Sequence, residues 1–147
     1  MKLGEYLEPE YVLADMKAEN KQEALRELLE PLQNVPGVDV QHALDILLER
    51  ERIGTTGIGD GIAIPHGKLE ELERILLIFG RSAKGVDFQA LDHKPCHIFF
   101  MVLAPEQTTG THLRILAHIS RLLKNEGFRD SLMQADPGEL HKLIAAT

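Results

Sequence analysis

The sequence predicts an α/β fold, a three-layer sandwich with a mixed, mostly parallel central sheet flanked by helices. Residues 74–81 and 97–103 are nearly continuous apolar runs, which are typical of strands covered on both faces. Segments with helical periodicity precede and follow these two runs, so helices are available for both faces of the sheet. No repeat, low-complexity tract or linker interrupts the 147 residues, and we expect one domain covering residues 1–147.

The N-terminal part of the chain predicts a short strand and then a helix. Residues 11–14 form a brief apolar run that suits a strand. Asn20 and Glu23 have the spacing of an N-cap and its capping-box partner. Apolar residues then recur at helical spacing, so we expect a helix over about residues 21–32.

The next part predicts a second helix, a loop and a brief strand. The helix is capped by Asp39 and runs to about residue 52. Residues 54–61 are rich in glycine and show neither helical nor strand periodicity, which indicates a loop. Residues 62–68 contain a short β-like run that ends at Pro65, so His66 is expected at a strand end or just beyond it.

The C-terminal part predicts helices that follow the second buried strand. Residues 111–123 repeat their apolar side chains with helical period, and residues 127–130 begin another short helical stretch. Asp136 as N-cap, with Pro137 in the first helical position, predicts a final helix.

Composition excludes several classes of function. Lys and Arg number 16 against 23 Asp and Glu, and the formal net charge of −7 disfavours binding to a phosphate backbone. A single cysteine, Cys96, cannot form an internal disulfide, and the first residues lack the apolar run of a secretory signal. No apolar stretch approaches the roughly 20 residues that cross a bilayer. We therefore expect a cytoplasmic protein that neither binds nucleic acid nor inserts into a membrane.

The glycine-rich stretch does not match a nucleotide-binding motif. Glycines stand at positions 54, 57, 59, 61 and 67. A phosphate loop requires G-x-x-x-x-G-K-[ST], but five residues separate Gly61 from Gly67 and Lys68 is followed by Leu69. The pattern is not the dinucleotide motif G-x-G-x-x-G either. These glycines either supply tight turns or form a side-chain-free rim where another protein's backbone comes close to a reactive residue.

Among the seven histidines, His66 stands out. Pro65 fixes the backbone before it, Gly67 leaves space after it, and the glycine-rich stretch lies directly upstream. His112 and His118 share a predicted helix but lie about 600° apart around its axis, which disfavours a zinc site. The residues alone leave two interpretations of His66 open, a reactive imidazole or a structural histidine at a strand end.

Two segments carry a resemblance to a known family. Residues 50–68 closely resemble the active-site signature of IIA domains of the mannitol/fructose class of the bacterial phosphoenolpyruvate-dependent sugar phosphotransferase system. Residues 103–113 resemble the segment that carries the family's second active-site histidine. The similarity covers essentially the whole chain, as one type 2 IIA domain. Within the family, the chain most resembles the stand-alone nitrogen-regulatory members.

The resemblance implies a phosphohistidine relay. His66 would accept a phosphoryl group from an HPr-like phosphocarrier, His112 would stabilise that group, and Arg50 would stabilise its charge. The acceptor would be a IIB protein or a regulatory target such as a transporter or kinase, in the regulation of nitrogen or potassium metabolism. No cofactor and no metal are implied. Neutral imidazole is itself a good nucleophile, and in a loose phosphoryl transition state the protein supplies positioning and charge.

The same resemblance implies a partner surface and leaves two alternative functions. Ile53, Ile58 and Leu113 would form an apolar docking patch for the donor, with Gly59 and Gly67 allowing close approach. The alternative is that each of the three apolar side chains packs inward. One alternative is a sugar-specific IIA subunit that passes phosphate to a IIB protein for fructose or mannitol uptake. The other is a non-catalytic regulatory binding module whose unphosphorylated form binds a transporter or kinase as a regulatory partner.

Overall fold

The computed structural model describes residues 1–108 and 110–147, and two long antiparallel strands lie at the centre of its sheet. These are β5 (Leu76–Val86) and β6 (Cys96–Pro105), paired with Phe79 opposite Phe100. Their apolar parts coincide with the predicted runs and are buried. β6 extends beyond the predicted run at both ends. β5 extends beyond it at the C-terminal end, because the strand continues through polar residues after a shift in register between Arg81 and Val86.

Four short strands complete a mixed, mostly parallel sheet, as predicted. They are β1 (Val12–Leu13), β2 (Gly57–Gly59), β3 (Ile62–Ala63) and β4 (His66–Leu69). The strand order is β1-β5-β6-β3-β2, and β4 also pairs with β6. β1 pairs in parallel with β5, and both β3 and β4 pair in parallel with β6, whereas the β2–β3 and β5–β6 pairs are antiparallel.

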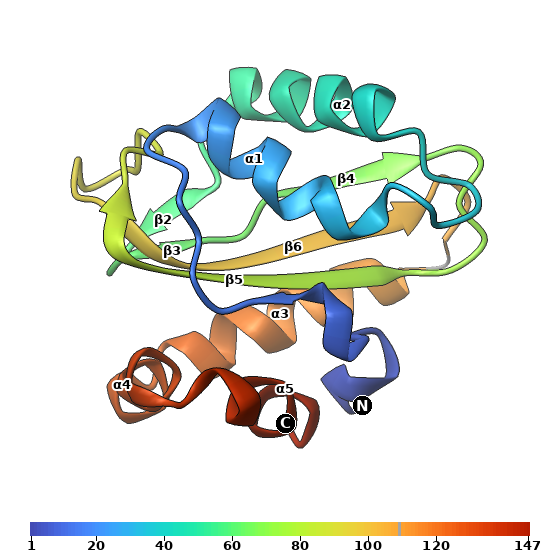
Figure 1. Cartoon of the computed structure of the whole chain (residues 1–147). Coiled ribbons are helices and arrows are strands. Elements are labelled where there is room, and N and C mark those ends of the chain that lie inside the picture. The colour runs from blue at the N-terminus through green and yellow to red at the C-terminus, as the bar shows by residue number, and fades with distance from the viewer. Residues whose placement is uncertain (109) are drawn as a thin grey trace.

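Helices cover both faces of the sheet, which confirms the three-layer sandwich (Figure 1). α1 (Lys21–Leu29) and α2 (Val40–Ile53) lie on one face. The other face carries α3 (Thr111–Leu123), α4 (Glu126–Gln134) and α5 (Pro137–Ala145). The remaining helical turns are 3₁₀ segments at Leu3–Glu5, Pro9–Tyr11 and Glu30–Leu32. Among the described helices, none combines the length and the apolar character that crossing a bilayer demands.

The predicted helix caps are confirmed in position but not in every hydrogen bond. Asn20 accepts from the backbone N–H of Glu23 at 3.0 Å, and Asp39 caps α2 in the same way. The carboxylate of Glu23 accepts from the N–H of Glu19 rather than from that of the N-cap, so the capping-box prediction is wrong in that detail. Asp136 stands at the N-cap of α5 without a side-chain cap bond, and its backbone carbonyl accepts instead.

The predicted loop over residues 54–61 is wrong in its second half, because β2 and β3 form a hairpin there. Asp60 and Gly61 form the turn, and both have positive φ angles, 56° and 76°. Asp-Gly is a favoured pair for a two-residue hairpin turn, so the signal was present in the sequence. A Cβ at Gly57 would lie 2.9 Å from Cα of Ala90, which explains why this position in β2 needs glycine.

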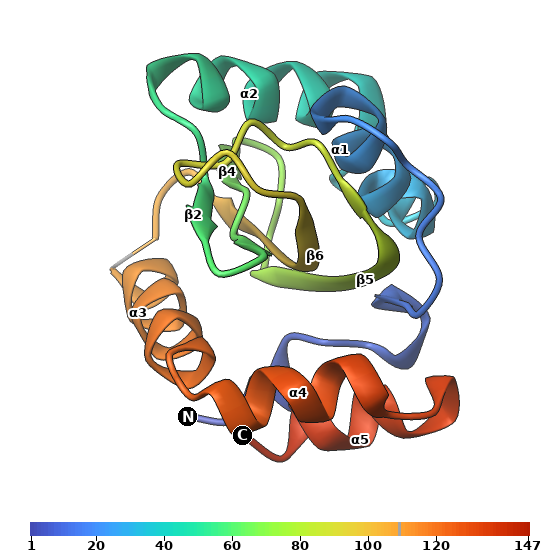
Figure 2. The same ribbon diagram turned by 90° about the vertical axis from the view of Figure 1, so that its left-hand side faces the viewer.

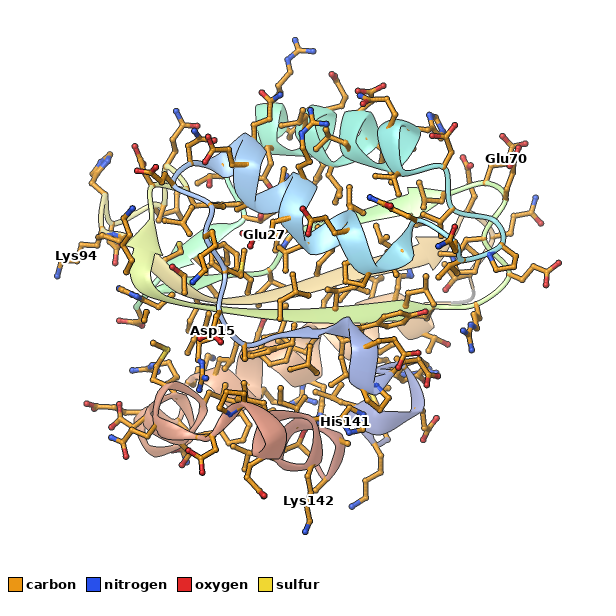
Figure 3. All side chains as sticks on the ribbon, viewed as in Figure 1. Asp15, Glu27, Glu70, Lys94, His141 and Lys142 are labelled. Carbon is orange, nitrogen blue, oxygen red and sulfur yellow. The ribbon has the colours of Figure 1, made fainter. Side chains whose placement is uncertain are left out.

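Side chains far apart in sequence tie the outer segments to this framework. Glu27 on α1 accepts from the backbone N–H groups of Lys17 and Ala18, and Nε2 of His141 donates to the carbonyl of Leu7 at 2.7 Å. Glu27 and His141 are labelled in Figure 3. His141 is therefore a partly buried anchor on α5. The chain termini lie side by side (Figure 2), joined by a hydrogen bond from Leu3 to Thr147.

Candidate functional site

His66 is held in a fixed orientation at the start of β4. His66 pairs with Val102 of β6 and is the first residue of β4. The sequence had predicted it at a strand end or just beyond one. Ile64 and Pro65 before it are buried, while the His66 side chain is half-buried. Nδ1 of His66 lies 3.0 Å from the carbonyl oxygen of Ile64. A carbonyl only accepts, so the proton lies on Nδ1 and Nε2 keeps its lone pair.

Two adjacent cavities meet at His66, and between them they bring the three predicted catalytic residues together. One measures about 140 Å³ and holds His112 and Leu113. The other measures about 160 Å³ and holds Arg50 and Ile58. β2 and β4, which carry Ile58 and His66, lie between α2 and α3 (Figure 2). The two cavities give His66 one histidine neighbour and one arginine neighbour.

His112 occupies the first turn of α3. Its Nδ1 lies 3.2 Å from Oγ1 of Thr108, just before the helix. Burial lowers the pKa of His112, and the positive charges of Lys68 and of His66 when protonated lower it further. The lowered pKa favours the neutral ring, which has one N–H to donate. Thr109, which belongs to the same predicted motif, lies outside the described residues.

Arg50 lies in the last turn of α2 and is half-buried. One guanidinium nitrogen donates to the carbonyl of Gly54 at 2.9 Å, which anchors the side chain to the segment that leaves the helix. A guanidinium has five N–H donors, so this bond leaves most of them free for an anion. The structure therefore places a fixed positive charge in the cavity that it shares with His66.

The predicted docking residues differ in how they are exposed. Ile53, Ile58 and Leu113 are 81%, 47% and 61% exposed, so none of the three packs into the core. Gly59 is buried with φ at 104°, and a Cβ at Gly67 would lie 3.0 Å from Ile46 of α2. Both glycines thus have a reason inside the chain, and their contact with a partner stays a prediction.

Sequence reasoning missed several polar residues of the site. Thr56 and Ser120 line the cavity that holds Arg50, and Lys68 lines the one that holds His112. Thr56 and Lys68 fall inside the motif and were available as signals. Ser120 lies two turns beyond His112 on α3, and only the fold brings it to His66. A broader hollow of about 440 Å³ lies beside Lys21 and contains none of the predicted site residues.

Other candidate chemistries find no support in the described part of the chain. Cys96 is fully buried, and burial, followed by the nearby charge of Asp92, raises its pKa to about 11. A thiol with that pKa is protonated near pH 7 and is a poor nucleophile. Within residues 1–108 and 110–147, no group of three or more His, Cys, Asp or Glu side chains could hold a metal ion.

Comparisons with known proteins indicate one family. The family model described as "Phosphoenolpyruvate-dependent sugar phosphotransferase system, EIIA 2" matches residues 5–147. A nitrogen regulatory protein of Bradyrhizobium diazoefficiens is 38% identical over 146 residues, covering 99% of this chain and 95% of the relative. A fructose-specific EIIA component of Haloferax volcanii is 46% identical over 98 residues, covering 67% of this chain and 64% of the relative.

Solved structures agree with this assignment. The nitrogen regulatory protein IIA-Ntr from Neisseria meningitidis superimposes with a TM-score of 0.90 at 30% identity, covering 97% of this chain and 98% of that one. IIA mannitol from Escherichia coli, at 22% identity and a TM-score of 0.76 over 94% of this chain and 98% of that one, shows the same fold. These matches confirm the resemblance found in the sequence. The chain belongs to the EIIA 2 family of the phosphoenolpyruvate-dependent sugar phosphotransferase system.

Proposed function

We propose that the chain acts as a single IIA domain over residues 1–147, a regulatory phosphocarrier that accepts a phosphoryl group on Nε2 of His66 and passes it on. The observation that supports this most directly is the hydrogen bond between Nδ1 of His66 and the carbonyl of Ile64. It leaves the lone pair of Nε2 for bonding to phosphorus. Family membership makes phosphoryl transfer the general activity of the chain, and this bond supports Nε2 of His66 as the atom that performs it.

The transfer needs no separate base. The lone pair of Nε2 forms the new N–P bond while the bond between phosphorus and the donor breaks and its electron pair returns to the donor. No proton leaves Nε2, because the ring proton stays on Nδ1, hydrogen-bonded to Ile64. The positive charge that develops on the ring is stabilised by that carbonyl. The reverse transfer to an acceptor follows the same path, as a relay requires.

Arg50 and His112 would stabilise the moving group from the two cavities. The Arg50 guanidinium offers a planar set of donors to the equatorial phosphoryl oxygens. With the Thr108 hydroxyl donating to Nδ1 of His112, the neutral His112 ring carries its proton on Nε2 and can donate to another oxygen. Positioned donors of this kind lower the energy of a transition state with spread negative charge.

The partner proposed as donor is an HPr-like phosphocarrier docking over Ile53, Ile58 and Leu113. These exposed apolar residues come from α2, β2 and α3, and Ile58 and Leu113 line the cavities on either side of His66. A donor that covers them would bring its phosphoryl group to Nε2 and exclude water from the site. We place this encounter in the cytoplasm, with a IIB protein or a regulatory target as acceptor.

Regulation is favoured over sugar uptake by the extent of the similarity. The nitrogen regulatory relative matches this chain over nearly the full length of both proteins. The fructose-specific relative is more identical but matches over a shorter stretch. Transfer of phosphate from this chain to a purified IIB protein, followed by formation of fructose or mannitol phosphate, would favour the sugar-specific alternative. Equal recovery of every binding target by wild type and by a phosphate-mimicking His66→Glu variant would favour the non-catalytic module.

The site assignment is tested by phosphorylation in solution. We incubate wild-type protein with phosphoenolpyruvate, the phosphocarrier and the enzyme that phosphorylates the phosphocarrier. The protein should gain one acid-labile phosphoryl group. His66→Ala should gain none, because among the described residues His66 is the histidine that lines both cavities. The matched control is His42→Ala, an exposed histidine on α2, which should be labelled like wild type. Retention of the label in folded His66→Ala would contradict the assignment.

A further inference from the structure

We propose that Glu51 is a positioning residue for His66, holding the ring in the tautomer with a free Nε2 by fixing Thr56 and, through Thr56, the carbonyl of Ile64. This inference rests on the proposed function for its consequence in catalysis. Its structural part concerns the unphosphorylated protein alone. Neither Glu51 nor Thr56 was expected from the sequence to take part in the site.

Glu51 has a buried carboxylate that binds three donors. Its side chain is only 4% exposed. Oε1 accepts from Nζ of Lys21 at 2.9 Å and from the backbone N–H of Thr56 at 2.9 Å, and Oε2 accepts from the Thr56 hydroxyl. Two of the three bonds therefore go to one residue, by both its main chain and its side chain. Such a pair of contacts fixes where the chain passes after it leaves α2.

The position of Thr56 determines the position of Ile64. The carbonyl oxygen of Thr56 accepts from the backbone N–H of Ile64 at 3.0 Å. The carbonyl oxygen of Ile64 then accepts from Nδ1 of His66 at 3.0 Å. A continuous series of hydrogen bonds thus leads from the Glu51 carboxylate to the imidazole ring. Because free imidazole exchanges between two tautomers, the Ile64 carbonyl is what selects Nε2 as the nucleophile, and its placement depends on Thr56.

The same segment also orients the arginine of the site. Arg50 donates to the carbonyl of Gly54, two residues before Thr56. Glu51 therefore holds a short stretch of chain to which both Arg50 and, through Ile64, His66 are anchored. A shift of this stretch would disturb the nucleophile and the charge-stabilising group together, and small displacements of such groups are costly for transfer.

Lys21 connects this arrangement to the core. Its ammonium lies 2.9 Å from Glu51, 3.3 Å from Oγ1 of Thr55 and 4.9 Å from the centre of the buried Phe88 ring. The Glu51 carboxylate is thus held by Lys21 on α1 as well as by Thr56 in the segment after α2. Glu49, two residues earlier on α2, offers a contrast, because its side chain is 65% exposed and pairs with exposed Arg52. The two glutamates share a helix and a charge, but only Glu51 contacts the site segment.

The test compares three variants of these glutamates. Glu51→Met removes all three acceptor contacts while keeping the length of the side chain, and Lys21 can turn into the open hollow beside it. We expect ¹⁵N NMR of the unphosphorylated protein to show a mixture of His66 tautomers in place of one. The variant should lose the orienting contribution of about one hydrogen bond, and phosphorylation should therefore be about tenfold slower. Glu49→Met, the matched control, should leave both tautomer and rate unchanged.

A conservative variant separates positioning from mere folding. Glu51→Gln keeps an acceptor for the Thr56 N–H and a group that can bond the Thr56 hydroxyl, so it should restore the single tautomer and bring the rate within about threefold of wild type. If Glu51→Met does not fold, Thr56→Val and Thr56→Ser replace it, since only serine keeps the hydroxyl anchor. We expect a tautomer mixture in the valine variant and one tautomer in the serine variant.

The outcomes for this inference and for the proposed function are distinct. An unchanged His66 tautomer in folded Glu51→Met, or an equal change in Glu49→Met, would overturn the positioning role. If wild-type protein shows no phosphate on His66, the proposed function fails, whereas the NMR comparison still decides whether Glu51 holds the ring. A tautomer change in Glu51→Met that Glu51→Gln reverses would support the inference in either case.

Discussion

The β5–β6 pair and the segment of residues 54–69 belong to one sheet but are held by different forces. β5 and β6 are long, and their buried aromatic rings pack edge to face, with Phe79 and Phe100 centred 5.1 Å apart. The segment 54–69 contains three strands of two to four residues each, and it presents Ile58 to solvent. Its geometry depends on single hydrogen bonds such as those of Thr56 and His66.

This difference separates stability from chemistry within one sheet. Burial of large side chains in β5 and β6 supplies free energy of folding that no single contact determines. The segment 54–69 also buries Ile62 and Ile64, but burial alone does not orient the His66 ring, which depends on its hydrogen bond to the carbonyl of Ile64. Substitutions in the strand pair should therefore change the free energy of unfolding, and substitutions around the segment should change transfer.

The largest expected effect tests the stability side of this comparison. Phe100→Ala should lower the free energy of unfolding by about 3–5 kcal/mol, because it leaves a cavity at the centre of the sheet. Denaturant titration measures this loss, and the rate of phosphorylation per folded molecule should stay unchanged. Phe128→Ala, at a half-buried position on α4, is the control and should cost less. A tenfold slower transfer by folded Phe100→Ala would show that the two regions are not independent.

The next effect tests the chemical side. Arg50→Lys should slow phosphorylation about 100-fold, because a single ammonium cannot replace a planar set of donors on the phosphoryl oxygens. The free energy of unfolding should change little, since Arg50 is half-buried and loses one bond to Gly54. Rapid-quench kinetics beside denaturant titration separates the two quantities. Arg52→Lys, at the exposed arginine two residues on, should behave like wild type, and an equal effect there would refute the role of Arg50.

A smaller effect is expected at the docking residue of the same segment. Ile58→Ser should raise the KM for the donor phosphocarrier about tenfold, the size expected for a central interface residue, and leave kcat unchanged. Leu91→Ser serves as control, because Leu91 is 67% exposed but lines neither cavity beside His66. Steady-state kinetics with varied donor concentration provides the measurement. A fall in kcat with constant KM would mean that Ile58 shapes the reacting centre instead of the docking surface.

The comparison also explains what the sequence could predict. β5 and β6 were predictable because burial on both faces requires a run of apolar residues, and that run is visible in the chain itself. The hairpin at Asp60-Gly61 was missed because a glycine-rich stretch of short strands has no hydrophobic periodicity to detect. Its one local signal is the Asp-Gly turn pair.

The candidate site was predictable where a residue type implies chemistry and not where geometry alone does. His66 stood out from its neighbours in the chain, and the resemblance supplied Arg50 and His112. Ser120 and Glu51 were missed because a serine on a helix and a glutamate among charged residues look like ordinary surface. Only the folded chain shows that one lines the cavity and that the other is buried against Thr56.

The smallest effect concerns the pKa of His112. Because the folded-state pKa lies below the ordinary value of 6.5, the unfolded chain binds more protons between the two values, and stability falls as pH falls through that window. Lys68→Met should raise the pKa of His112 only part of the way, since burial is the larger cause. NMR titration of the His112 ring measures the shift, with Lys84→Met, at a distant exposed ion pair, as control. An unchanged pKa in Lys68→Met would mean that the charge of Lys68 does not act on the His112 ring, and that the other causes lower the pKa without it.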